Sequence, residues 1–349
     1  GARPIISRPP SMSFANTIRR RLILLVFVVF GVSVVTFVIS HMIPGDPARM
    51  MAGERATDAT VAHIRAELGL DQPIPVQYVT YVRGLLHGDF GISIRTQRPV
   101  IDDILLFFPA TIELAIAALL LAIILGIPLG VLSAVAKDKA VDQVSRTISV
   151  TGISTPAFWL GLLLIYVFYG RLGILPGSGR IASDIPPPHT VTGFYTIDAL
   201  IAGNGRAFVS ALLHLILPAL TLGFVHLGIV TRQIRSAMLE VLQEDYIRTA
   251  RASGISRVRI VFHYALRNAL IPSVTMIGLA FGDLLYGAVL TETVFAWPGM
   301  GNYVVQSITA LDFPAIMGFT VVASTAYVLL NMLVDLLYMA LDPQIREVG

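Results

Sequence analysis

The stretch TIELAIAALLLAIILGIPLGVLSAV, residues 111–135, holds a single acidic residue and no basic residue. At about 1.5 Å per residue, a helix of this length crosses the roughly 30 Å hydrocarbon core of a bilayer. Backbone groups inside lipid must be satisfied by hydrogen bonds within the protein, and the sequence lacks the alternating segments that a membrane barrel requires. The stretch therefore predicts a transmembrane helix.

Five further stretches have the same character, so we expect an all-α polytopic membrane protein with six transmembrane helices. The composition agrees, because 55% of the residues are hydrophobic, 13% are charged, and the mean hydropathy is +0.76. The six predicted spans are residues 22–43, 111–135, 147–169, 208–230, 269–291 and 314–337.

The distribution of Lys and Arg predicts the orientation of these spans. If the N-terminus, with Arg19, Arg20 and Arg21 before the first span, lies inside, the inner side holds 16 basic residues against 7 acidic ones. Six crossings then place both termini in the cytoplasm. The pI of about 9.3 follows from this topology, and the chain shows no nucleic-acid motif, so we expect no nucleic-acid partner.

The predicted organisation has three parts: a disordered tail at 1–15, a first transmembrane helix with an extracytoplasmic helical segment at 16–110, and a core domain at 111–349. The core domain contains five transmembrane helices. In the outer segment, apolar stripes predict two helices that end at Gly69 and Gly88. These helices could form a lid or a seat for an external partner, or a clasp packed on the spans. We expect the second outer segment, 170–206, to be an irregular loop.

A polar insert, EDYIRTARASGISRVRIVFHYALRNALIP at 244–272, separates two of the spans and lies in a predicted cytoplasmic loop, 240–268. Tyr246, Ile247 and Ala250 recur at helical spacing, so the insert predicts an amphipathic helix over about 241–253. Gly254 would end this helix in a left-handed cap, and Ser256 would begin a second one. The insert is either a docking element for a soluble partner or a solvated loop that only fixes topology.

Within the first of these helices, Glu244 precedes Arg248 by four residues, which favours an ion pair on the helix surface.

Ionisable residues in or near the spans are candidates for function. They are Glu113, His214, His226, Asp283 and Asp335. Glu113 and Asp335 lie near span ends, where we expect water to be close. Asp283 alone sits well inside a span, where it would either line a pathway or pack between helices.

The sequence contains none of the catalytic motifs that we looked for. HExxH, GxSxG and metal-spaced Cys or His clusters are missing, and there is no cysteine for a disulfide. A Walker A sequence requires Gly-Lys-Ser/Thr, and the only lysines, Lys137 and Lys139, follow Ala and Asp. We therefore predict a non-catalytic chain with no metal site and no cofactor of its own. Any ATP that drives it would be hydrolysed on a partner.

Seven ordered blocks resemble a known family. They are HMIPGDP (41–47), AELGLDQP (66–73), HGDFGIS (87–93), MLEVLQEDYIRTARASG (238–254), ALRNALIP (265–272), LTETVFAWPGMG (290–301) and NMLVDLLYMALDP (331–343). In these blocks the chain resembles the B-type permease subunits of the oligopeptide/dipeptide/nickel class of ABC importers, and among them the dipeptide permeases. The resemblance covers about residues 16–345.

The resemblance implies that the insert is an EAA-type loop whose first helix enters a cleft on an ATPase subunit. The EAA positions are Arg248, Thr249 and Ala250, so only Ala250 and Gly254 keep the general pattern. The ATPase-coupling residues implied are Glu244, Asp245, Tyr246, Ile247, Arg248, Thr249, Ala250, Arg251 and Gly254.

The resemblance also implies the partners and the location. The chain would pair with a C-type permease, two ABC ATPases carrying ATP and Mg, an extracytoplasmic substrate-binding protein and lipid of the bacterial cytoplasmic (inner) membrane. Dipeptides or short peptides are the expected substrates, although relatives also carry glutathione, nickel chelates and haem. The alternatives are a proton-coupled secondary transporter that uses Asp283 or Glu113, and a membrane scaffold without transport.

Overall fold

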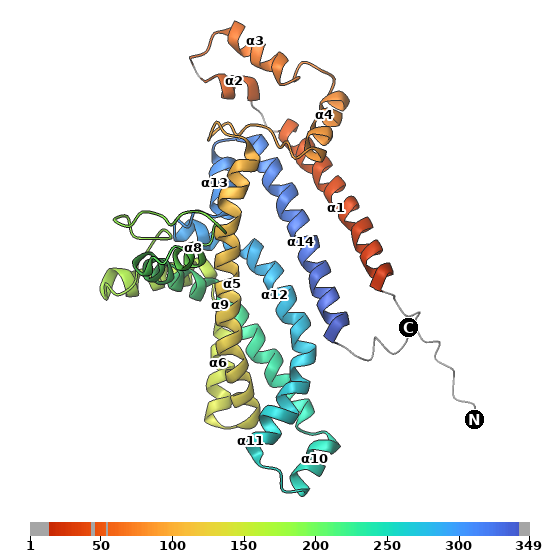
Figure 1. Ribbon diagram of the computed structural model, residues 1–349, viewed down its shortest axis with the longest axis vertical. Helices are drawn as coiled ribbons and strands as arrows, with labels where there is room; N and C mark the ends of the chain where they lie inside the picture. The colour runs from red at the N-terminus through yellow and green to blue at the C-terminus, as the bar shows by residue number, and fades with distance from the viewer. Residues whose placement is uncertain (1–13, 43–45, 54, 342–349) are drawn as a thin grey trace, which may run out of the picture.

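The computed structural model describes residues 14–42, 46–53 and 55–341, and these residues form helices without a β-strand (Figure 1). The expected tail at 1–15 lies almost wholly outside them. The helices are α1 (Phe14–Met42), α2 (Pro47–Ala52), α3 (Asp58–Glu67), α4 (Ile74–Leu86), α5 (Val100–Val135), α6 (Ala140–Ser154), α7 (Ala157–Leu164), η1 (Ile165–Arg171), α8 (Tyr195–Ile201), α9 (Gly205–Val241), α10 (Asp245–Ala252), α11 (Arg257–Arg259), η2 (Ile260–Ala265), α12 (Leu266–Val294), α13 (Met300–Thr309) and α14 (Phe313–Leu341).

The centre of the fold is a bundle of α5, α9 and α12. Helices α5 and α9 lie so close that a Cβ atom at Gly223 would be 2.7 Å from the carbonyl oxygen of Ala118. A Cβ at Gly130 would be 2.8 Å from the carbonyl oxygen of Thr231. Small residues permit such backbone approach between membrane helices, where dispersion replaces the hydrophobic effect as the driving force. Only glycine fits at these two contacts.

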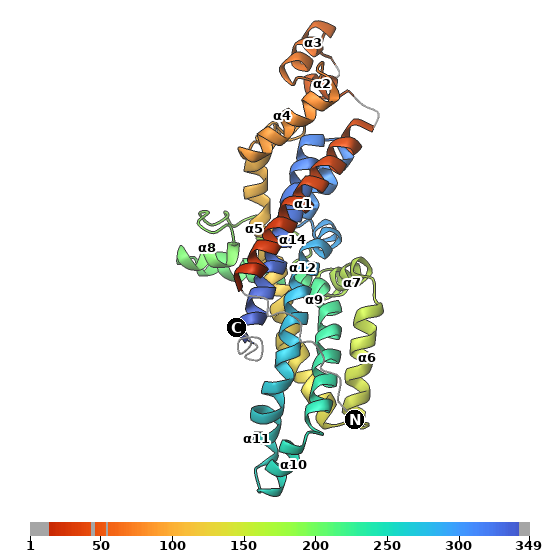
Figure 2. The same cartoon turned by 90° about the vertical axis from the view of Figure 1, so that its right-hand side faces the viewer.

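Five helices are long and apolar enough to cross a membrane, namely α1, α5, α9, α12 and α14, which confirms five of the six predicted spans. Helix α5 begins at Val100, eleven residues before the predicted start of its span. Helix α9 continues to Val241, eleven residues beyond the predicted end of its span. Figure 2 shows α1 running along α14 at the side of the bundle. Hydropathy thus located the apolar part of each helix and missed the polar extensions.

The third predicted span, over 147–169, corresponds to a bent pair of helices, which would be the sixth span if the pair crosses the membrane as one unit. The segment consists of α6 and α7, which meet at an angle of 107°. Pro156 disfavours a helical conformation of the residue before it, and Thr155 accordingly has an extended backbone with φ −88° and ψ 123°. Beyond α7 the chain continues as the π-helix η1. The proline explains the break, which a hydropathy window spanning it does not detect.

The outer helical segment projects beyond one end of the bundle, while α10 and α11 lie at the other end (Figure 1). Its two predicted helices are α3 and α4, and Gly69 and Gly88 follow their ends with φ of 65° and 77°. Helix α2 was not predicted. The loop at 170–206 was expected to be irregular but contains α8, at whose start Asp198 accepts hydrogen bonds from the backbone N–H groups of three preceding residues, 191–193.

Helix α13, also not predicted, is held by a buried carboxylate. Glu292 of α12 is fully buried and accepts hydrogen bonds from the Thr111 hydroxyl at 2.6 Å and from the Asn302 N–H at 3.0 Å. The Trp297 indole donates to the carbonyl oxygen of Ala110 at 3.0 Å. A side chain at Gly299 would collide with the Glu292 carboxylate. The block LTETVFAWPGMG therefore supplies the contacts that hold α5, α12 and α13 together, which we call the Glu292 joint.

We expect Gly299→Ala to lower the temperature of thermal unfolding in detergent, because overpacking of a filled site costs about 1–3 kcal/mol. Gly31→Ala in α1 is the matched control, since a Cβ there meets no atom within 4 Å. Equal unfolding temperatures for the two variants would show that the Glu292 joint does not limit stability.

Candidate functional site

The segment that joins α9 to α12 forms one end of the molecule (Figures 1 and 2). The structure confirms the predicted break at Gly254, which has φ 75° and follows α10. The Gly254 N–H donates to the carbonyl oxygen of Arg251 at 3.1 Å, and the Ile255 N–H donates to that of Ala250 at 3.2 Å. These two bonds form a Schellman motif, which satisfies carbonyl groups at the end of a helix. The direction of the chain after α10 is thereby fixed.

Helix α10 is anchored to the bundle along one face. Ile247 is fully buried and Ala250 nearly so, and both belong to an apolar cluster that includes Ile234 of α9 and Val261 of η2. The amide of Asn268 in α12 donates a hydrogen bond to the Tyr246 hydroxyl at 2.9 Å. Helix α10 is therefore packed on the helices that precede and follow it.

The opposite face of α10 is exposed and charged. Of the predicted coupling residues, those that face solvent are Glu244, Asp245, Tyr246, Arg248, Thr249, Arg251 and Gly254. Acidic residues occur at the start of this face and arginines toward its end, which is the arrangement that a helix dipole favours.

One local prediction about the insert was wrong, and a second is confirmed in position only. Arg248 pairs with Asp245 at 3.0 Å, and not with Glu244, because Glu244 precedes the helix as its N-cap residue. Both partners are largely exposed, so the pair adds little stability. Ser256 does occupy the N-cap position of α11, but its side chain makes no capping hydrogen bond.

A buried ion pair that the sequence did not reveal lies close to this segment in the chain. Both guanidinium nitrogens of Arg235 that face Asp142 bond to its carboxylate, at 2.7 and 2.8 Å, and the Ser133 hydroxyl adds a third bond at 2.5 Å. The pair joins α9 to the first turn of α6, although its members are 93 residues apart. Charge-assisted bidentate bonds of this kind fix orientation.

Glu113 is not near water, contrary to our expectation. It is buried in an ion pair with Arg180 at 2.5 Å, and the Thr196 hydroxyl and N–H also donate to it at 2.6 and 2.9 Å. The Arg180 guanidinium lies 3.8 Å from the centroid of the Tyr195 ring. Glu113 therefore fastens the outer loop to α5. A carboxylate inside a span suggests a cationic partner, but Arg180 is 67 positions away in the sequence, so the sequence does not reveal that it is the partner.

Asp283 is exposed on α12 of this chain, whereas Leu284 beside it is fully buried. Buried His226 of α9 is close enough to interact with it electrostatically. Among the described residues no cation pairs with Asp283. His214 lies elsewhere on α9 and its ring Nδ1 is bonded to the carbonyl oxygen of Ser210. The side chain of Asp335 is outside the described part of the chain.

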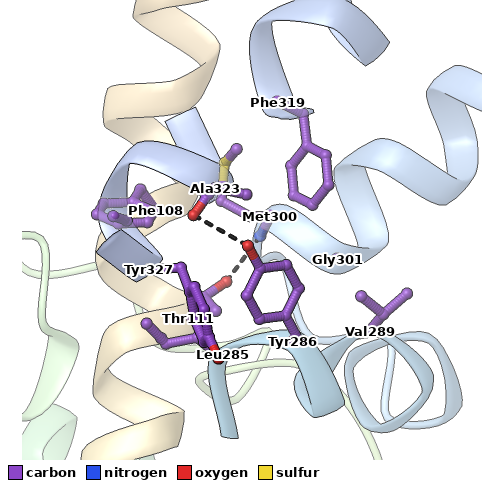
Figure 3. Close-up of a pocket in the computed structure, with 11 residues that line it drawn as sticks. Phe108, Thr111, Leu285, Tyr286, Val289, Met300, Gly301, Phe319, Ala323 and Tyr327 are labelled. Atoms are coloured by element: carbon purple, nitrogen blue, oxygen red, sulfur yellow. Dashed lines mark hydrogen bonds between the residues drawn. The ribbon is translucent and has the colours of Figure 1, made fainter. Parts of the chain in front are cut away.

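A small pocket lies between α5, α12, α13 and α14 (Figure 3). The rings of Tyr286 and Tyr327 are 5.4 Å apart in it, and the Tyr286 hydroxyl donates to the carbonyl oxygen of Ala323 at 3.2 Å. The pocket volume is about 30 Å³, which is enough to admit water. The pocket cannot hold a peptide and is a feature of helix packing.

The sequence matches two models of known protein families. A model described as a binding-protein-dependent transport system inner membrane component matches residues 126–347, and the model of the N-terminal part of such components matches residues 14–115. The chain belongs to this family. Members of the family are multi-pass membrane permeases that act with a binding protein and ATPase subunits, so the predicted resemblance is confirmed.

Individual permeases of the family cover almost the whole chain. The probable D,D-dipeptide transport system permease protein DdpB of Escherichia coli (strain K12) is 65% identical over 97% of this chain and 99% of its own length. The dipeptide transport system permease protein DppB of that strain is 44% identical over 95% and 98%. The glutathione transport system permease protein GsiC of Escherichia coli O1:K1 / APEC is 40% identical over 95% and 99%. A chain of the MetNI methionine ABC transporter in inward facing conformations has a TM-score of 0.46 and 17% identity, over 69% of this chain and 93% of that one.

We expect Ile247→Ala to loosen α10, because removing a buried isoleucine side chain costs about 2–5 kcal/mol. Amide hydrogen exchange over residues 245–253 should become faster, while exchange in α5 and α9 stays unchanged. Arg248→Ala, which truncates an exposed neighbour, is the control. Unchanged exchange in Ile247→Ala would mean that the apolar contact does not anchor the helix.

Proposed function

We propose that this chain is a permease subunit of an ABC importer that translocates dipeptides or short peptides, and that α10 is its coupling helix. One observation carries the proposal: α10 is anchored to α9 and α12 along one face and exposes a charged face on the other. A force applied to the exposed face reaches two long helices directly. The peptide permeases DdpB and DppB, which resemble the chain over nearly its full length, support the substrate class.

The complex that we propose has several subunits. Two ABC ATPases hold ATP and Mg, and each closes beneath one of two permeases, of which this chain is the B-type and a C-type relative is the other. A binding protein delivers the peptide to the outer side, where α2–α4 project. Both termini of the chain lie in the cytoplasm. ATP is hydrolysed on the ATPase subunits, since this chain carries no Walker A sequence.

A proton-coupled secondary transporter is not supported. Its first candidate proton site, Glu113, is held in a buried ion pair with Arg180 and accepts two further hydrogen bonds from Thr196. The relatives of this chain, moreover, are permeases of binding-protein-dependent systems.

Asp283 is the residue that we place on the translocation path. A carboxylate in the middle of a span is too costly to face lipid, so its exposure on α12 indicates a surface that meets water or the second permease. A path along the shared axis of the two permeases meets this requirement.

The first test of the function is reconstitution. We expect the complex of both permeases and both ATPases to hydrolyse ATP faster when the peptide-loaded binding protein is present. A complex that assembles without this stimulation would contradict the proposal.

We expect Gly254→Val to abolish co-purification of the ATPases without affecting membrane insertion. The backbone of Gly254 is left-handed, which glycine adopts without strain, while a β-branched residue at this position is strained by about 1–2 kcal/mol or more. Gly254→Asn is the matched control, since asparagine tolerates this conformation. Normal peptide uptake in Gly254→Val would contradict the coupling role.

Because the chain contains no cysteine, Asp283→Cys provides a clean probe of the path. In the assembled complex we expect a charged thiol reagent to modify it at least about tenfold faster than Leu120→Cys, an exposed apolar position on α5, because thiolate chemistry needs water. No difference between the two variants would place Asp283 in a dry contact with the second permease.

A further inference from the structure

A basic groove lies beside α10, and the function proposed above does not account for it. We define it by its three cations, Lys137 after α5, Arg251 of α10 and Arg257 of α11. Its volume is about 510 Å³. The other lining residues are Ala134, Val135, Leu239, Leu242, Gln243, Ile255, Ile260 and Val261. None of the residues that line the groove is acidic.

The three cations are not neutralised within the described part of the chain. Lys137 and Arg251 are exposed and have no ion pair there. Arg257 donates one hydrogen bond, at 3.4 Å, to the carbonyl oxygen of Val135 at the end of α5. Like charges above an apolar floor repel one another, and water relieves this repulsion less well in a hollow than on an open surface. The basic groove is therefore suited to an anionic occupant.

Continuity with α10 identifies that occupant. Arg251 belongs to α10 itself, Gln243 lies just before it, and Arg257 follows the turn at Gly254. A protein that covers the exposed face of α10 must also cover the rim of the groove. We propose that the basic groove receives acidic side chains of the ATPase subunit that docks on α10, and this rests on the proposed function.

The charges also set the direction of docking. The start of α10 is acidic at Glu244 and Asp245, whereas Arg251 and the groove make the other end basic. A partner with an acidic patch at one end of its cleft binds this surface favourably in one orientation only, because the reverse orientation places like charges together. The groove thus extends the docking surface from one helix to the α5–α6 turn and gives it polarity.

The test uses the assembled complex with its second permease and both ATPases in detergent. The variants are Lys137→Glu, alone and combined with Arg257→Glu. The control is Arg259→Glu, which reverses an exposed charge of α11 that lines a different hollow. The measurement is the dissociation constant of the ATPase over a series of NaCl concentrations.

We expect the double variant to bind the ATPase at least about tenfold more weakly and with less dependence on salt, and the control to change by less than about twofold. Equal weakening in the double variant and the control would overturn the proposal, because the effect would then be one of general charge.

An anionic lipid headgroup is the competing occupant. Nanodiscs of pure phosphatidylcholine are therefore compared with nanodiscs that also contain phosphatidylglycerol. If Lys137→Glu reduces retention of phosphatidylglycerol and leaves ATPase affinity unchanged, the groove is a lipid site and the proposal is wrong.

If the proposed function is wrong, the complex with the unaltered chain will show no peptide-stimulated ATP hydrolysis. If only the proposal for the basic groove is wrong, that stimulation will be present and the groove variants will bind the ATPase normally.

Discussion

The close approach of α5 and α9 is the constraint on which the rest of the fold depends. At Gly130 and Gly223 the backbones are so near that any side chain would meet a carbonyl oxygen of the facing helix. Such contacts maximise dispersion between helices that gain little from leaving lipid. They also fix the register of α9 against α5. Helices α6 and α12 then pack on this pair, and α10 is placed by the end of α9.

The proposed coupling role makes two opposing demands on one short helix, α10. Docking to a soluble partner requires polar, exposed side chains, while transmission of force requires a firm attachment to the membrane helices. Ile247 and Ala250 supply the attachment, and the remaining faces stay free. Helical periodicity makes this division possible within eight residues, because positions three apart share a face. The Schellman motif at Gly254 then turns the chain back toward α12 without leaving the last carbonyl groups unsatisfied.

The parts of this structure that could be predicted from sequence are those that depend on local signals. Hydropathy located five spans, and the spacing of Ile247 and Ala250 with the following glycine located α10 and its end. The ion pairs Glu113–Arg180 and Arg235–Asp142 could not be found in this way, because each joins residues brought together only by the bundle. The break at Pro156 was visible as a proline, but prolines also occur in continuous helices here, as Pro218 does in α9. Whether a proline bends or breaks a helix depends on its neighbours in space.

Buried carboxylates hold the bundle together near both of its ends. Toward the end that carries α2–α4, buried carboxylates accept directed hydrogen bonds: Glu292 from Thr111, Glu113 from Arg180, and Asp312 from the Ser93 hydroxyl at 2.5 Å. Such networks have few alternative arrangements, because each displaced group would be left unpaired in a dry site. Around α10 itself the contacts are mainly apolar, but the Arg235–Asp142 pair, with Ser133, also fastens α9 to α5 and α6 near this end. Carboxylate networks therefore hold the bundle near both of its ends, whereas α10 is attached to it mainly by apolar packing.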